Sequence, residues 1–302
     1  MEAIFFDRFG GPEVLQLGQI EEPHAGPGEI RIHVRATGLN PLDYRIRNGW
    51  LADSVPTTFP AVPGNEASGI VDEVGEGVTG VTVGDAVFGL TSGGSFAQFA
   101  LSSVFAAKPA DLDWAEAAAL PVAGATARRD LDLLDVTAGD TVLIHGAAGG
   151  IGTVAVQLAA ARGATVIGTA SPANHEYLRS LGAIPVAYGD GLVDRVREIA
   201  PQGIDAVYDI AGQGALPDSI TLRGGTTDRI LTIADFAGPS LGIALPMHVL
   251  PDAAQILTEQ ADQVVDGKLR ITIAAALPLA DAAKAMERSE TGHAQGKIVL
   301  HR

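Results

Sequence analysis

The stretch "HGAAGGIGTVAVQLA" (residues 145–159) decides how this chain folds. Four of its first eight residues are glycine, which loses more backbone entropy on folding than any other residue. The apolar, β-rich run "DTVLI" (Asp140–Ile144) precedes it, and apolar residues from Ile151 to Leu158 recur with helical spacing. A strand, a glycine-rich turn and a helix in this order indicate a place where another molecule approaches the bare backbone.

The glycines point to a dinucleotide. In a dinucleotide-binding βαβ unit they allow a tight turn off the first strand, contact between backbone and pyrophosphate, and close packing of the helix on the sheet. The spacing here is Gly146-x-x-Gly149-x-x-Gly152, with Gly150 added. The alternative is an ordinary strand–helix turn that uses glycine for packing. We predict that these four glycines and Ile151 bind the cofactor.

The second predicted strand bears on which dinucleotide binds. A carboxylate about 20 residues beyond the glycines normally holds the ribose 2′-hydroxyl of NAD. In "TVIGTASPANHEYLR" (residues 165–179) the first acid is Glu176, so the sequence permits NADP. Ser171, Asn174 and His175 could donate hydrogen bonds to a 2′-phosphate. Alternatively, Ser171 caps the following helix, and the two roles can coexist.

Composition and charge exclude several classes of protein. The 302 residues suggest about two domains at roughly 150 residues each. The chain has no cysteine, which excludes disulfides, thiolate nucleophiles and cysteine-ligated zinc. A formal charge of -16 opposes non-specific binding to nucleic acid or anionic lipid. No apolar run approaches the roughly 18 residues of a membrane helix and no signal-peptide pattern is visible, so we expect a soluble, cytoplasmic protein.

The pattern of elements changes along the chain. Short β-like runs separated by glycine and proline fill roughly the first hundred residues and predict a mostly antiparallel unit. From about Trp114, strands alternate with helices, which predicts a parallel sheet with helices on both faces. After about Gln263 the pattern returns to strands, and this tail could rejoin the N-terminal unit. The predicted strands of the middle part are Thr141–Ile144, Thr165–Thr169, Ile184–Tyr188, Ala206–Ile210 and Arg229–Ile233.

Several stretches follow one another in an order typical of one superfamily. They are "VPGNEASGIVDEVGEGV" (62–78), "GDAVFGL" (84–90), "LPVAGATA" (120–127), the glycine stretch and "GKIVL" (296–300). Along essentially its whole length the chain resembles the zinc-free quinone oxidoreductase branch of the medium-chain dehydrogenase/reductase superfamily. The resemblance implies an α/β fold with a GroES-like β domain, residues 1–118 completed by 264–302, and a Rossmann domain, residues 119–263. It also implies NADPH as the hydride donor and a homodimer.

The resemblance also assigns site residues. The segment "NPLDYRIRNGW", which begins at Asn40, matches one whose Asn and Asp lie beside nicotinamide and substrate, and this implicates Asn40 and Asp43. Thr126 matches a threonine near the nicotinamide amide, and Tyr188 matches a phosphate-binding tyrosine. We expect Asn40 and Thr126 to position the nicotinamide, Asp43 to fix the loop and Tyr44 to supply a proton.

Structural alternatives remain for these residues. Asn40 to Asp43 can form an ordinary turn with an Asx-type hydrogen bond. Tyr44 can simply line the pocket, and His145 is interpreted as a structural residue. We add Ala211 and Ile233 to the predicted cofactor site.

No metal site is predicted. Zinc-dependent relatives carry a histidine where this chain has Asn65, and the seven histidines show no paired spacing that would replace it. A further departure is Asn174, which stands where a lysine often assists the 2′-phosphate.

We therefore predict a zinc-independent, NADPH-dependent oxidoreductase that transfers hydride to a quinone or an α,β-unsaturated carbonyl. Such chemistry needs little acid–base machinery, because the cofactor carries the hydride and the protein aligns donor and acceptor and excludes water. Two alternatives stay open: an enoyl reductase of a biosynthetic pathway, and a nucleotide-binding protein with vestigial activity.

Overall fold

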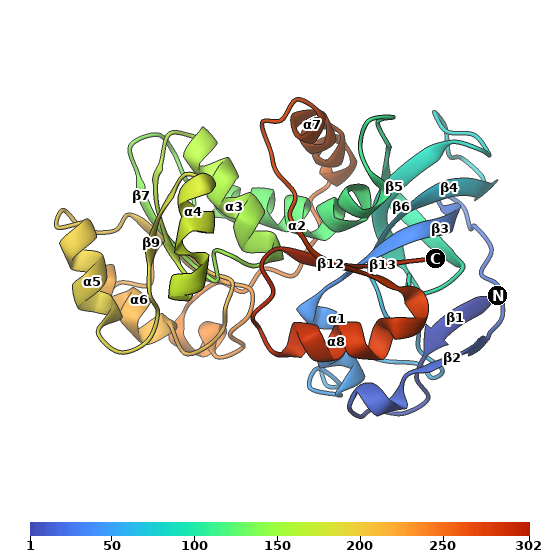
Figure 1. Ribbon diagram of the computed structural model, residues 1–302, viewed down its shortest axis with the longest axis horizontal. Coiled ribbons are helices and arrows are strands. Elements are labelled where there is room, and N and C mark those ends of the chain that lie inside the picture. Colours follow the sequence, from blue (N-terminus) through green and yellow to red (C-terminus); the bar gives the residue numbers. More distant parts are fainter. The chain divides into compact units, whose positions relative to one another are not determined.

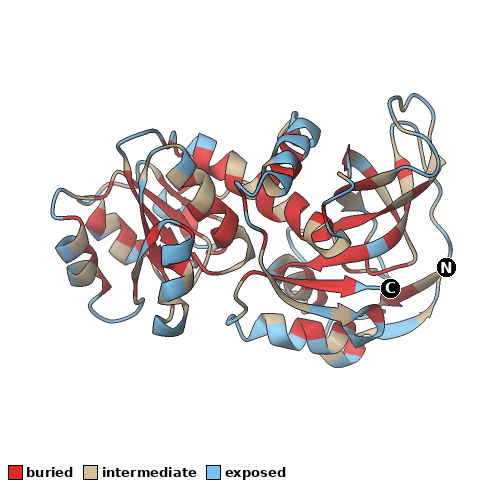
Figure 2. Cartoon of the chain, turned by 45° about the horizontal axis from the view of Figure 1, so that its top comes forward, coloured by how far each residue is buried: buried red, intermediate tan, exposed pale blue.

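The computed structural model describes all 302 residues and divides the chain into two compact units. Unit 1 comprises Met1–Val122 and Asp252–Arg302, and unit 2 comprises Ala123–Pro251 (Figure 1). Both chain ends therefore fold into the same unit. The strands of each unit are mainly buried, whereas loops and the outer faces of helices are exposed (Figure 2).

Unit 1 is built on a mostly antiparallel sheet, as predicted. Its strand order is β12-β13-β3-β4-β5-β6, and an additional pairing of β3 with β6 closes four of these strands into a ring. Only β12 and β13 pair in parallel. The strands are β3 (Ile30–Leu39), β4 (Glu66–Val74), β5 (Ala86–Ser92), β6 (Phe99–Ala107), β12 (Ile273–Pro278) and β13 (Lys297–His301), with a separate pair β1 (Glu2–Phe5) and β2 (Gln16–Gln19).

The C-terminal strand joins unit 1 through apolar packing. β13 pairs antiparallel with β3, and in Figure 1 the red strand lies beside the blue one. Ile298 and Leu300 of β13 share an apolar core with Leu39 and with Met286. The helices of unit 1 are α1 (Pro41–Arg47), α7 (Ala253–Val265) and α8 (Ala282–Glu290), with 3-10 turns at Pro12–Val14 and Leu279–Asp281.

Unit 2 holds the predicted parallel sheet, with strand order β11-β10-β7-β8-β9. All five predicted strands are present. They are β7 (Thr141–His145), β8 (Thr165–Thr169), β9 (Ala183–Val186), β10 (Ala206–Asp209) and β11 (Ile230–Thr232). The helices are α3 (Gly150–Ala161), α4 (His175–Ser180), α5 (Leu192–Ile199) and α6 (Leu216–Leu222), with 3-10 turns at Pro172–Asn174 and Gly238–Leu241. The long helix α2 (Trp114–Leu133) runs across the boundary of the two units.

Two elements differ from the sequence-based expectations. The segment that follows Asn40 forms a helix of seven residues rather than a turn alone. Helix α7 belongs to unit 1, whereas the predicted domain boundary at residue 263 cuts through it. The physical reason is the apolar face of α7, because Ile256, Leu257 and Ala261 are buried and the helix packs against β6. None of the helices combines the length and apolar content that crossing a bilayer requires.

Candidate functional site

The predicted nucleotide-binding residues lie at one edge of the parallel sheet in unit 2. Gly146 follows β7, Ser171 follows β8, Tyr188 follows β9, Ala211 follows β10 and Ile233 follows β11. Parallel strands end at the same edge of a sheet, so these five positions share that edge. β7 lies between β8 and β10, so the strand order reverses at β7. Ligands of open α/β sheets bind outside the carboxyl ends of the strands at such a point.

The glycines have three different tasks in this turn. Gly146 has a φ of +73°, which favours glycine and lets the chain turn off β7. A Cβ at Gly152 would come within 2.3 Å of the Gly146 carbonyl oxygen, so this position keeps helix and turn in contact. A Cβ at Gly149 would meet only that oxygen, at 3.4 Å, so the surface of Gly149 faces open space.

The first turn of α3 presents unpaired donors next to this open surface. The first N–H of the helix to be satisfied is that of Thr153, which donates to the Gly149 carbonyl at 2.8 Å. The N–H groups of Gly150, Ile151 and Gly152 have no acceptor in the protein. Together with the helix dipole they favour an anion at this end of α3. These residues therefore fit the diphosphate of a dinucleotide.

The residues predicted for the 2′-phosphate gather after β8. The Asn174 side chain donates to the Ser171 hydroxyl at 3.4 Å, and the Ser171 side chain caps no backbone N–H. The Nε2 atom of His175 is buried without a partner. The nearby carboxylate of Glu176 forms an ion pair with Arg179.

Arg195 on α5 is a candidate that the sequence did not single out. Its guanidinium donates to the carbonyl oxygens of residues 187–190, at 2.8 to 3.4 Å. No carboxylate lies within ion-pairing distance of it, so its positive charge remains beside Tyr188, which is half exposed. Because β9 pairs with β8, this loop neighbours the segment around Ser171. The sequence places Arg195 on the helix that follows β9, which puts it near this edge of the sheet. Its hydrogen bonds to the loop carbonyls are visible only in the folded structure.

The remaining predicted residues of unit 2 are less polar or already paired. Thr126 is partly buried on α2. The N–H of Ala211 donates to the Asp209 carboxylate at 3.0 Å. His145 is buried 3.1 Å from the Ser219 hydroxyl, and burial lowers the pKa of its imidazole. A neutral, enclosed imidazole agrees with a structural role.

A second polar cluster is buried in unit 1. Glu66 and Lys297 are 0% and 5% exposed, although 231 residues separate them in the chain. The Lys297 ammonium donates to Glu66 Oε1 and, at 2.6 Å, to Asn40 Oδ1. The other oxygen of Glu66 accepts the Val122 N–H at 2.8 Å. The buried pair is thus hydrogen-bonded as well as charge-neutral, which buried ions require. Sequence reasoning named Asn40 but missed the two charged residues.

Asp43 joins two loops of this cluster. One carboxylate oxygen accepts the Asn40 N–H at 2.7 Å and the other accepts the Gly64 N–H at 3.2 Å. Burial raises the pKa of Asp43 to about 7, although both N–H groups and the Lys297 charge favour the ionised form. The contacts are those expected of a residue that fixes the loop.

Tyr44 is the next residue of α1 and is partly buried against apolar side chains. Its ring meets Trp50 edge-on at 6.2 Å, and Trp50 is 67% exposed. Burial raises the pKa of the Tyr44 phenol, which makes it a weaker acid. The charge of Arg45 and its hydrogen bond to the phenol lower this pKa, but they do not offset the effect of burial.

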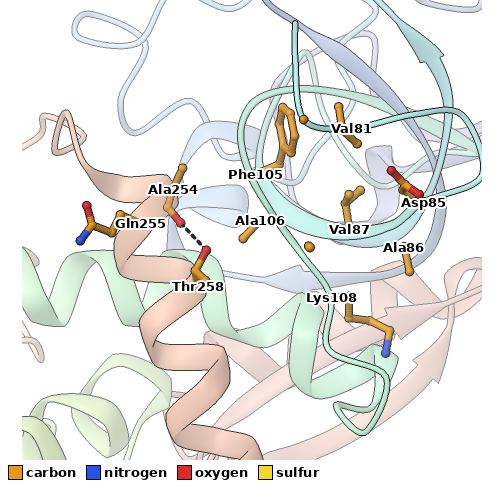
Figure 3. A pocket seen from close by; sticks show the side chains of 12 residues that line it. Val81, Asp85, Ala86, Val87, Phe105, Ala106, Lys108, Ala254, Gln255 and Thr258 are labelled. Carbon is orange, nitrogen blue, oxygen red and sulfur yellow. Dashed lines mark hydrogen bonds between the residues drawn. The ribbon is translucent and has the colours of Figure 1, made fainter.

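A hollow of about 550 Å³ in unit 1 contains none of the predicted site residues (Figure 3). It lies between α7 and the strands β5 and β6. Its polar side chains already have partners inside the protein: Asp85 accepts from Thr82, and Lys108 donates to two backbone carbonyls. Thr258 donates to the Ala254 carbonyl, drawn as a dashed line. We assign no function to this hollow.

Both chain ends form an antiparallel β unit, and the part between them forms a parallel sheet that carries a glycine turn. This combination is typical of dinucleotide-dependent dehydrogenases and reductases. Residues 26–104 match the family model for the alcohol dehydrogenase GroES-like domain. Residues 181–300 match the model described as zinc-binding dehydrogenase. In this chain no group of three or more His, Asp or Glu side chains is placed to hold a metal ion.

Similarity to individual proteins identifies the family. A chloroplast envelope quinone oxidoreductase homolog of Arabidopsis thaliana is 32% identical, over 99% of this chain and 98% of its own length. The NADPH-dependent alkenal/one oxidoreductase of the same plant is 30% identical over 100% of this chain and 79% of its own. The Escherichia coli quinone oxidoreductase, solved with NADPH, is 27% identical and superposes with a TM-score of 0.88 over 100% of both chains. The chain therefore belongs to the quinone oxidoreductases of the medium-chain dehydrogenase/reductase superfamily.

Proposed function

We propose that this protein is an NADPH-dependent reductase that transfers hydride to a quinone or an α,β-unsaturated carbonyl without a metal ion. The observation that carries the proposal is the open surface of Gly149 beside three unpaired N–H groups. The names of the relatives support both the cofactor and the two substrate classes. When bound, NADPH supplies the hydride, and the protein supplies binding, orientation and exclusion of water.

The preference for NADPH over NADH follows from charge at the sheet edge. We propose that Ser171, Asn174, His175 and Tyr188 contact the 2′-phosphate. Arg195 adds an uncompensated positive charge to the loop that carries Tyr188. The Glu176 carboxylate, which follows His175, forms an ion pair with Arg179 and therefore repels a phosphate weakly.

The remaining predicted residues are assigned to the reacting end of the cofactor and to the substrate. Thr126, Ala211 and Ile233 contact the nicotinamide side of NADPH in this proposal. Asn40 and Asp43 shape the substrate side in unit 1, and Tyr44 lines it. The raised pKa of Tyr44 favours this lining role over proton donation, and the proton then comes from water.

We also propose a homodimer formed through the edge of the unit 2 sheet. The edge strand β11 has three residues, and beyond it only Ala244 makes a bridge to Leu231. Phe236, Met247 and Val249, on the segment that follows, are 47%, 60% and 55% exposed. Light scattering on purified protein tests this: a mass of one chain, 31.0 kDa, would contradict it.

The substitution Gly149→Ala tests the nucleotide site. The added methyl meets nothing closer than 3.4 Å in the protein, so we expect a stability loss of at most about 1 kcal/mol. It would lie where the diphosphate binds, so we expect the Kd for NADPH, measured by fluorescence, to rise roughly tenfold or more, about 1.4 kcal/mol. Gly152→Ala shows what structural damage to the turn looks like. Its methyl clashes with the backbone, so this variant should lose stability as well as NADPH affinity, whereas Gly149→Ala should lose mainly affinity. Unchanged NADPH affinity in Gly149→Ala would remove the site from this turn.

An acceptor panel tests the reaction. With wild-type protein we expect NADPH oxidation by a simple naphthoquinone or an enone to exceed that with NADH. Turnover of an enoyl thioester alone would instead support a biosynthetic enoyl reductase. Tight NADPH binding with no oxidation by any acceptor would support a vestigial enzyme.

A further inference from the structure

We propose that the side-chain amide of Asn65 donates a hydrogen bond to the carbonyl oxygen of the acceptor substrate and stabilises the negative charge that forms there. The proposal rests on the function proposed above and adds a residue to it.

The charged pair dictates how the Asn40 amide is oriented. The Lys297 ammonium can only donate, so the atom that faces it at 2.6 Å must be the Asn40 oxygen. The Asn40 nitrogen then faces Glu66 Oε1 at 2.8 Å, an atom that only accepts. Reversing the Asn40 amide would break both contacts.

The orientation of Asn40 in turn dictates that of Asn65. The Asn40 nitrogen also donates to Asn65, at 2.9 Å, so the Asn65 atom on this side must be its oxygen. The Asn65 nitrogen is thereby directed away from Asn40. The ion pair thus fixes, through one intervening amide, which end of Asn65 faces outward.

The backbone around Asn65 is held as firmly as its side chain. Its carbonyl accepts the Thr91 N–H at 2.9 Å. The preceding Gly64 has a φ of +97° and donates its N–H to Asp43. A Cβ at Gly64 would lie 2.3 Å from the Ser95 hydroxyl, so the turn is closely packed. A donor held in this way loses little entropy when it binds a substrate.

The Asn65 amide has N–H groups free to donate, whereas the Asn40 amide has none. Both N–H groups of the Asn40 amide are taken, by Asn65 and Glu66, and the residue is 4% exposed. The Asn65 nitrogen has no acceptor in the protein, and its side chain is only partly buried. A substrate carbonyl that reaches this cluster therefore finds its hydrogen-bond donor in Asn65. Asn40 positions that donor.

The chemistry balances without an added acid. Hydride from the dihydronicotinamide forms a bond to the acceptor carbon, and a π electron pair of the conjugated system moves onto the carbonyl oxygen. The oxygen becomes an enolate or phenolate, and NADP⁺ is the oxidised product. Asn65 donates a hydrogen bond and keeps its proton, and water later protonates the product. One such donor to a developing oxyanion changes kcat by about 10²- to 10³-fold in other enzymes.

The test is Asn65→Asp, which keeps the oxygen that Asn40 needs and removes the outward donor. We expect kcat with an enone to fall about 100-fold, with the Kd for NADPH unchanged by fluorescence. We expect activity relative to wild type to recover as pH falls through the pKa of the introduced carboxyl, because its protonated form donates again. A structural role would give no such recovery.

A second measurement, made on wild-type protein, tests the proposal even if Asn65→Asp does not fold. In wild-type protein with NADP⁺, hydrogen bonding to a bound enone lowers its carbonyl stretching frequency in the infrared, and Asn65→Ala abolishes this shift. Asn65→Asp with wild-type kcat, or an unshifted carbonyl in wild-type protein, would overturn the proposal. Wild-type protein that binds NADPH but reduces no acceptor would instead overturn the proposed function.

Discussion

The two polar regions of this protein are built in opposite ways. The nucleotide region of unit 2 consists mainly of backbone: a glycine turn, an open glycine surface and three free N–H groups within seven consecutive residues. The cluster of unit 1 consists of side chains from three separate segments, which carry Asn40, the neighbours Asn65 and Glu66, and Lys297. All of them except Asn65 are buried.

The comparison shows two ways of placing a donor. A backbone donor needs only a suitable turn. Glycine allows that turn, and the cost is the backbone entropy of a few neighbouring residues. A buried side-chain donor needs partners for every polar atom, because an unpaired one in a low-dielectric interior costs about 1–3 kcal/mol. The unit 1 cluster meets this demand with an ion pair, and the removal of one partner should therefore have large effects.

Lys297→Met should have the largest effect. It leaves the Glu66 carboxylate buried without its cation, which typically costs about 3–5 kcal/mol of unfolding free energy. Urea denaturation would measure the loss. The double variant Lys297→Met/Glu66→Gln removes both charges and should recover most of the stability. If the single variant is as stable as wild type, the buried carboxylate does not depend on its cation, and the contrast between the two regions fails.

Asp43→Asn should change how stability depends on pH. In the folded protein the pKa of Asp43 is raised to about 7 from its ordinary value of 3.8. Between pH 4 and 7 the unfolded chain loses this proton and the folded chain keeps it, so stability falls as pH rises through this window. The asparagine does not titrate. The stability of the variant relative to wild type should therefore rise between pH 4 and 7, by roughly 2–4 kcal/mol at about 1.4 kcal/mol per pKa unit.

Thermal or urea denaturation at several pH values measures this difference, in which all other titrating groups cancel to first order. A difference that stays constant from pH 4 to 7 would mean that Asp43 is ionised in the folded protein throughout this window.

Arg195→Gln should have the smallest effect, confined to unit 2. Loss of one partly exposed charge beside the proposed 2′-phosphate site should raise the KM for NADPH roughly fivefold, about 1 kcal/mol, and leave the KM for NADH unchanged. The penalty should shrink at high salt, because salt screens exposed charges. Arg197→Gln, on the exposed side of the same helix, is the matched control. Equal effects on both cofactors would indicate that Arg195 only supports the loop.

Sequence reasoning reached the two regions unequally. The strand–glycine–helix pattern predicted β7, the turn and α3, because all three lie within about twenty consecutive residues. Asn40 and Asp43 were found only through a resemblance, and the helix that follows Asn40 was missed because it is one short segment with little apolar periodicity. Glu66, Lys297 and Arg195 were missed because no local pattern marks a charge whose partner lies on another element.

The sequence by itself determined the order of strands and helices, the glycine turn with its free N–H groups, and the absence of thiol chemistry. These features depend on local backbone preference and composition. Only the tertiary structure decided that the C-terminal strand carries Lys297 to Glu66, that this pair orients Asn40 and Asn65, and that Arg195 lies beside Tyr188. The physical reason is that buried hydrogen bonds and ion pairs join atoms brought together by packing of the whole chain.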